Sequence, residues 1–126
     1  MHYSVNYNSE MHIVEIKVQG DFSLKEAREI FSESAKVTKE KNCYLIFTDL
    51  LEATMKLSVT EIYDLPKILL DILALSEINA NKLKRAFVVA KNSKDYSFHE
   101  TVSNNRGQRI KAFEDIDKAR GWLLEK

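Results

Sequence analysis

The sequence predicts an α/β fold, with a mixed sheet of about five strands and four helices in the order β-β-α-β-α-β-α-β-α. Two segments near the N-terminus alternate apolar and polar residues, two later runs are apolar almost throughout, and amphipathic segments separate them. Strands linked through helices pair in parallel, whereas two strands joined by a turn form an antiparallel hairpin. The length of 126 residues fits a single domain over residues 1–126.

The chain opens with a predicted β-hairpin. Tyr3, Val5 and Tyr7 alternate with polar residues, which indicates a half-buried strand. A second alternating run over residues 11–18 predicts the partner strand, which Gly20 should close. The two strands are therefore expected to pair antiparallel.

Two helices are predicted to begin at capping boxes, in which a serine and a glutamate three residues later satisfy free backbone N–H groups. The first begins at Ser23, has an amphipathic pattern and should end before Asn42. The second begins with Ser58 and Glu61 and is unusually apolar.

Pro66 falls inside the second helix. Proline removes a backbone hydrogen bond from a helix interior, so one bent helix is expected; the alternative is a separate helix capped by Asp64. Leu70, Leu75 and Ile78 fall partly outside the main apolar stripe. They predict either a helix buried by the rest of the domain or an exposed apolar patch for self-association or an apolar ligand.

Residues 43–48 and 86–90 are apolar almost throughout, which predicts two strands covered on both faces. The first of them should end at Asp49. The remaining predicted elements are a short helix through Phe98 and Val102, a strand over residues 109–113 and a final helix. The inward face of the final helix should consist of Ile116, Ala119, Trp122 and Leu123.

The composition is that of a globular protein without a membrane span. Hydrophobic residues make up 44% and charged residues 30%, and no apolar run approaches the roughly 20 residues that cross a bilayer. The N-terminus lacks the basic and apolar blocks of a signal peptide, and the single Cys43 has the apolar neighbours of a buried thiol. These features predict a cytoplasmic protein.

The net charge is zero, but residues 82–111 hold 8 basic and 2 acidic side chains. Such asymmetry can mark an anion-binding face, whereas a strand, a helix and a second strand would spread the charges over several faces. The second interpretation is favoured. No recognised reading motif accompanies the basic residues, so no nucleic acid partner is predicted.

Asp49, Glu52, Ser58 and Glu61 are the candidate site residues, in a predicted loop between the third strand and the second helix. Carboxylates at the end of an α/β strand can act as acids, bases or metal ligands, but no second carboxylate or histidine stands at a diagnostic spacing. A structural role in capping or turn formation is favoured. No catalytic residue, metal or cofactor is predicted, and an enzyme that uses Asp49 with His99 is the least favoured hypothesis.

The C-terminal segments KRAFVVAK and GQRIKAFEDIDKARGWLLEK resemble the SpoIIAA-like group. Trp122 and Leu123 form the Trp-Leu pair typical of that group, and the order of elements and the strand ending at Asp49 extend the resemblance over nearly the whole chain. The group is related to the STAS domains of bacterial anti-sigma-factor antagonists and is sometimes grouped with Sec14-like lipid-binding domains.

The resemblance implies a position for a phosphoacceptor. In phosphorylatable STAS antagonists a kinase phosphorylates a serine at the start of the helix after the third strand, and Ser58 fits this position. Leu57 replaces the aspartate of the motif and Thr60 its glycine, so the motif is largely lost and a role of Ser58 as N-cap is favoured.

The resemblance also implies a function. It indicates a non-enzymatic, regulatory domain that binds a protein partner through the loop from Asp49 to Ser58 and the second helix. The alternative that it implies is Sec14-like binding of a small apolar ligand or lipid. The apolar second helix, by itself, predicts a homodimer.

Overall fold

The computed structural model describes residues 2–90 and 109–125 and contains one five-stranded sheet. Its strands lie in chain order: β1 (His2–Asn8), β2 (Ile13–Phe22), β3 (Leu45–Met55), β4 (Lys84–Val88) and β5 (Arg109–Phe113). β1 pairs antiparallel with β2, and the three following pairs are parallel. The predicted mixed sheet is confirmed, with the N-terminal hairpin at one edge.

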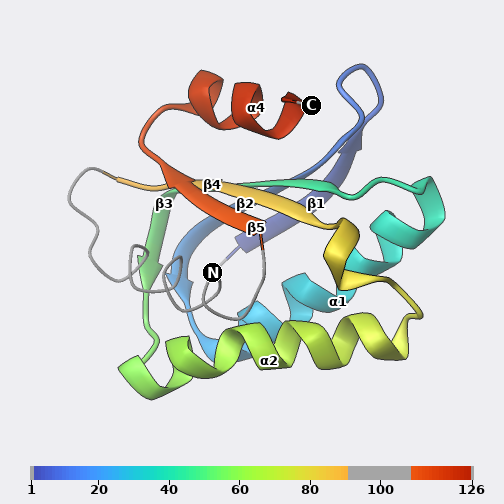
Figure 1. The fold of residues 1–126 in the computed structure, drawn as a ribbon. Coiled ribbons are helices and arrows are strands. Elements are labelled where there is room, and N and C mark those ends of the chain that lie inside the picture. Colours follow the sequence, from blue (N-terminus) through green and yellow to red (C-terminus); the bar gives the residue numbers. More distant parts are fainter. Residues whose placement is uncertain (1, 91–108, 126) are drawn as a thin grey trace.

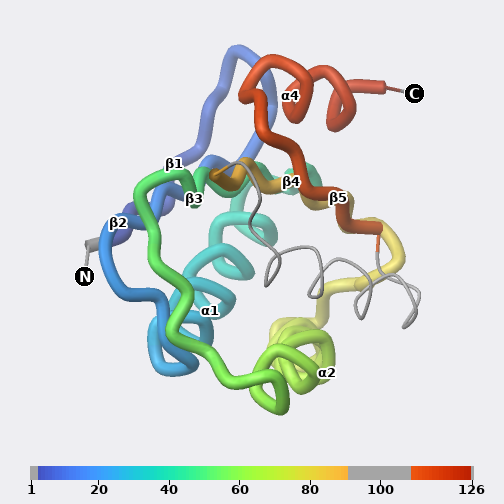
Figure 2. The backbone as a smooth tube through the Cα atoms, turned by 90° about the vertical axis from the view of Figure 1, so that its left-hand side faces the viewer, coloured from blue at the N-terminus to red at the C-terminus, as the bar shows by residue number. Residues whose placement is uncertain are grey.

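Three α-helices pack against the sheet within the described residues: α1 (Leu24–Lys41), α2 (Val59–Leu75) and α4 (Ile116–Leu124). Figure 1 and Figure 2 show α1 and α2 on one face, called here the inner face, and α4 on the opposite, outer face. The predicted helix through Phe98 and Val102 lies outside the described residues. None of the described helices is long and apolar enough to cross a membrane.

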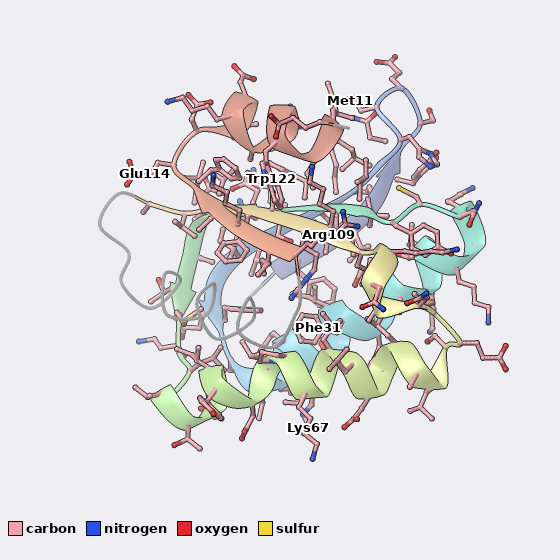
Figure 3. All side chains as sticks on the ribbon, in the orientation of Figure 1. Met11, Phe31, Lys67, Arg109, Glu114 and Trp122 are labelled. Atoms are coloured by element: carbon pink, nitrogen blue, oxygen red, sulfur yellow. The ribbon has the colours of Figure 1, made fainter. Side chains whose placement is uncertain are left out.

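Alternation along the strands divides the core into two layers. In β2, Val14 and Ile16 pack with α1 and α2 on the inner face, whereas Ile13 packs with α4 on the outer face. Figure 3 shows Phe31 on the sheet side of the inner helices and Trp122 on the sheet side of α4. The buried side chains of the smaller, outer layer are Ile13, Phe47, Ala86, Val88, Ala119 and Leu123.

Two strands run past the points at which the sequence predicts that they end. β2 continues through Gly20 to Phe22, and β3 continues through Asp49 to Met55. The two extensions pair with each other in parallel, with Phe22 opposite Met55. The predicted ends are wrong because this pairing joins segments far apart in the sequence, and neither segment signals it alone.

The predicted starts of α1 and α2 and the predicted end of α1 are confirmed. Asn42, in the left-handed conformation (φ 50°, ψ 45°), ends α1 and donates its N–H to the Thr38 carbonyl oxygen. α2 is one helix with Pro66 inside it, so the alternative of two helices is excluded. α4 begins after Asp115, whose side chain accepts a hydrogen bond from the Lys118 N–H at 3.1 Å. Each boundary depends on residues within one helical turn, so it can be predicted from the local sequence.

Cys43 is a buried free thiol, as predicted. Its Sγ donates a hydrogen bond to the His12 carbonyl oxygen at 3.1 Å. Burial raises the pKa of the thiol above its ordinary value, because the thiolate would lose its hydration.

The raised pKa of Cys43 predicts a loss of stability in alkali. The folded state favours the protonated thiol, so this contribution to stability is present below the unfolded pKa of about 8.5 and is lost as the pH rises above it. From about pH 8 to about pH 10, the free energy of unfolding of the wild type should fall more steeply than that of Cys43→Ala. Denaturant titrations at several pH values measure both slopes, and equal slopes would contradict the prediction.

Candidate functional site

Ser58 caps the start of α2. Its backbone N–H donates to Glu61 Oε1 at 2.9 Å, and its Oγ accepts a hydrogen bond from the Glu61 N–H at 3.1 Å. This capping box is the one predicted, and the extended backbone of Ser58 (φ −71°, ψ 164°) leads from the strand into the helix. The Ser58 hydroxyl and the Glu61 carboxylate therefore both serve the helix start.

Replacement of Ser58 by alanine should lower the free energy of unfolding by about 1 kcal/mol, because the Glu61 N–H loses its acceptor. Ser58→Asp keeps an acceptor there and should stay within about 0.5 kcal/mol of the wild type. Thr60→Ala is the matched control, since Thr60 is exposed in the same turn and lies outside the box. Chemical denaturation measures the three values, and an equal loss in Thr60→Ala would argue against capping.

The four residues predicted to share one loop do not lie together. Asp49 is inside β3, and its Oδ1 accepts a hydrogen bond from the backbone N–H two residues later at 3.0 Å. The strand from Asp49 to its end spans about 20 Å before Ser58 is reached. The structure therefore separates Asp49 and Glu52, which lie on the sheet, from Ser58 and Glu61 at the helix start.

Glu52 belongs to a polar network across the β2–β3 pair. Its carboxylate accepts a hydrogen bond from the Gln19 amide and lies 3.8 Å from Lys17 Nζ. The Gln19 hydrogen bond first, and the Lys17 charge second, lower the pKa of Glu52. A carboxylate with a lowered pKa stays ionised near neutral pH, which fits a surface ion pair better than a general acid.

Asp49 also lines a polar groove on the outer face, called here the outer groove. It has a volume of about 510 Å³ and is bordered by β1, β2, β3 and α4. Figure 2 shows the tip of the β1–β2 hairpin and α4 on this same face of the sheet. The polar residues that line the outer groove are Ser4, Asn6, Asn8, Glu15, Lys17, Asp49 and Arg120.

Arg120 and Glu15 form the central contact of the outer groove. Arg120 Nη2 lies 3.2 Å from Glu15 Oε2, and the guanidinium carbon lies 5.1 Å from the centroid of the Phe47 ring. Asn8 Nδ2 donates to the other oxygen of Glu15 at 2.8 Å. These contacts tie α4 to β2, so they have a structural role. The only sequence signal for the outer groove is the polar alternation in the first two strands. The groove could not be predicted further, because the residues that line it come from opposite ends of the chain.

A small apolar cavity, called here the inner cavity, lies between the sheet and the inner helices. Its volume is about 50 Å³, whereas pockets for small molecules measure about 300–1,000 Å³. Arg85 of β4 lines it, 6.0 Å from the centroid of the Phe31 ring, and desolvation lowers the pKa of Arg85 to about 10. Sequence reasoning missed the burial of Arg85, because the basic residues around it suggest a solvated segment.

Two of the three residues predicted to form an apolar patch are exposed, and the third is buried. Leu70 and Leu75 are 37% and 87% exposed, whereas Ile78 is buried. Its assignment to an exposed patch is wrong because the chain reverses at Glu77 (φ 59°) and the Ile78 N–H bonds to the Leu73 carbonyl oxygen at 2.9 Å. The turn directs Ile78 into the core.

Other exposed residues extend this surface toward the start of α2. Val59 and Tyr63 are more than half exposed, and Figure 3 shows Lys67 pointing away from the sheet. We call the set Val59, Tyr63, Lys67, Leu70 and Leu75 the outward face of α2, and the exposed carboxylates Asp64 and Asp71 lie on the same helix. It is the surface that sequence periodicity partly identifies.

Within residues 2–90 and 109–125, no three His, Cys, Asp or Glu side chains lie close enough to hold a metal ion. His99, which the enzyme hypothesis pairs with Asp49, lies outside these ranges.

No protein-family model and no curated protein sequence matches the chain. The anti-sigma factor antagonist SpoIIAA in its unphosphorylated form has a similar structure, with a TM-score of 0.60 at 8% identity over 99% of this chain and 100% of that chain. An uncharacterised protein of the DUF3478 family from Shewanella loihica PV-4, with a SpoIIAA-like fold, gives 0.57 at 16% identity over 98% and 93%. At these identities the likeness shows the fold. The chain therefore has a SpoIIAA-like, STAS-related fold.

Proposed function

We propose that residues 1–126 form one non-enzymatic regulatory domain that binds another protein through the outward face of α2. The observation that carries the proposal is the set of large apolar side chains that α2 leaves exposed. SpoIIAA, which has the same fold, is an anti-sigma factor antagonist and so acts on another protein. The buried free thiol of Cys43 fits a reducing compartment, which supports a place in the cytoplasm.

The spacing of the outward face suits a contact between helices. Val59, Tyr63, Lys67 and Leu70 recur every three or four residues, so they share one side of α2. Tyrosine is enriched among the residues that carry most of the binding energy at protein interfaces, and the buried centre of an interface is depleted in lysine and acidic residues. An apolar groove or an amphipathic helix on the partner would match this arrangement.

We assign Ser58 to capping and not to a phosphorylation switch. A phosphate on its Oγ would add negative charge beside the Glu61 carboxylate, which bonds to the Ser58 N–H. This repulsion opposes the attraction that a helix N-terminus offers to a phosphate. Mass spectrometry of the protein purified from its own cells tests the assignment: a species heavier by about 80 Da that maps to Ser58 would contradict it.

The partner is sought with matched variants. The tagged chain captures proteins from its own cells, and each captured polypeptide is purified and titrated against the wild type, Leu70→Glu and Met11→Glu. Leu70 and Met11 are equally accessible, at 37% and 38% exposed, but Met11 lies at the hairpin tip, far from α2 (Figure 3). Each variant therefore adds one charge to a different surface.

The partner should bind Leu70→Glu at least about tenfold more weakly than the wild type and Met11→Glu with unchanged affinity. Equal binding of the wild type and Leu70→Glu by every captured polypeptide would overturn the proposal. Binding of an apolar ligand is not proposed, because the inner cavity is too small for one.

A further inference from the structure

β1 lies at an edge of the sheet. It pairs with β2 on one side, and within the described residues no strand pairs with its other side. Edge strands of soluble proteins are usually blunted by lysine, proline or a bulge, but the sequence of β1, HYSVNYN, contains no proline, lysine or acidic residue. Backbone groups of alternate residues point away from β2 and can bond to another strand.

We propose that two copies of this chain pair antiparallel through β1, about a two-fold axis at Val5. The two five-stranded sheets then form one continuous sheet. This interface lies apart from the outward face of α2, so the inference goes beyond the proposed function and does not rest on it. It also replaces the homodimer that the apolar sequence of α2 predicts.

The sequence of β1 is complementary to itself about Val5. In the pair, Val5 faces Val5 of the second copy, Tyr3 faces Tyr7 of the second copy, and Ser4 faces Asn6 of the second copy. Tyr3, Val5 and Tyr7 are half-buried and pack against the inner core, so each leaves apolar surface at the edge. Directly opposed aromatic and β-branched side chains are the pairs that stabilise antiparallel strands.

The position of α1 allows this pairing. α1 packs against both β1 and β2, so its axis runs beneath the line between them. With strands about 4.8 Å apart, the two-fold axis beside β1 places the two copies of α1 about 10 Å from each other, the distance at which helices pack. The proposed pair therefore brings the two copies of α1 to packing distance.

The charges on α1 match across the two-fold axis. Tyr3 donates its hydroxyl hydrogen to Glu33 Oε1 at 3.0 Å, and Lys41 Nζ lies 5.7 Å from the centroid of the Tyr7 ring. Glu33, Val37 and Lys41 share one side of α1, because they are spaced by four residues.

Since Tyr3 faces Tyr7 of the second copy, Glu33 comes next to Lys41 of the second copy at each end. Val37, which is half-buried, meets Val37 of the second copy at the axis. The side of α1 nearest the β1 edge thus presents an apolar centre between two opposite-charge pairs.

Sedimentation equilibrium of the full chain tests the proposal. The wild type should reach twice the monomer mass of 14.6 kDa as its concentration rises. Lys41→Glu places two carboxylates at each end of the interface and should weaken the dimer about tenfold or more. The double variant Glu33→Lys/Lys41→Glu restores opposite charges and should recover the wild-type dissociation constant within about threefold.

Lys67→Glu is the matched control, since it makes the same charge change on α2 and should leave the dimer intact. Val5→Asp, which opposes two carboxylates at the axis, should also dissociate it. A wild type that stays monomeric up to about 1 mM would overturn the proposal. So would a dimer that Leu75→Glu dissociates but Lys41→Glu and Val5→Asp do not, or a double variant that fails to recover.

Discussion

Replacement of Leu123 by alanine should lower the free energy of unfolding by about 3 kcal/mol. Leu123 is 1% exposed and packs with Ala119 of the same helix and with Phe47 of β3. The outer layer contains few buried side chains, so its neighbours cannot close the space that the leucine leaves. α4 is short and packs on the sheet mainly through this layer. Leu123 therefore contributes a large part of the buried contact between α4 and the sheet.

Chemical denaturation of Leu123→Ala and Leu124→Ala measures this effect. Leu124 is the next residue of α4 and is 47% exposed, so its truncation should cost less than about 1 kcal/mol. The same deletion of side-chain atoms at adjacent positions therefore separates burial from helix propensity. Equal losses in the two variants would mean that α4 does not pack on the sheet as described.

Replacement of Leu69 by alanine should lower the free energy of unfolding by about 4 kcal/mol, toward the upper end of leucine truncations. Leu69 is 3% exposed and lines the inner cavity. The cost of such a truncation rises with the volume of the hollow that remains, and here the new space joins about 50 Å³ that is already present. The adjacent Leu70→Ala, at a position 37% exposed, is the control and should cost less than about 1 kcal/mol.

A comparison of Leu69→Ala with the wild type tests whether the inner cavity of the wild type binds apolar ligands. An enlarged cavity lined mainly by apolar side chains can bind benzene, which stabilises the folded state in proportion to its occupancy. Benzene should therefore raise the melting temperature of Leu69→Ala and leave that of the wild type unchanged. A clear rise in the wild type would show that the inner cavity opens to ligands and would revive the apolar-ligand alternative.

The local sequence was sufficient to predict a helix boundary where that boundary depends on neighbouring residues. The capping box of Ser58 and Glu61 and the left-handed Asn42 each act within one helical turn. Alternation likewise predicted the hairpin, because one face of each strand meets the core.

Features that depend on distant pairing could not be predicted. Asp49 looks like the end of a strand, and only the parallel pairing with the end of β2 carries β3 further. Arg85 looks like part of a solvated basic segment until α1 and the sheet enclose it. For this reason the four candidate residues, which were predicted to share one loop, lie on two different elements. The outer groove could not be predicted either, because it depends on the contact between Arg120 and Glu15, which lie near opposite ends of the chain.

The sheet orders its strands as the chain does, from β1 to β5. No strand has to enter between two strands that are already paired, because each new one joins a free edge. During synthesis the hairpin can therefore form first, and each later strand finds its neighbour already in place as it leaves the ribosome. The last strand and α4 complete the outer layer, so the packing of Leu123 marks the final step of such a vectorial assembly.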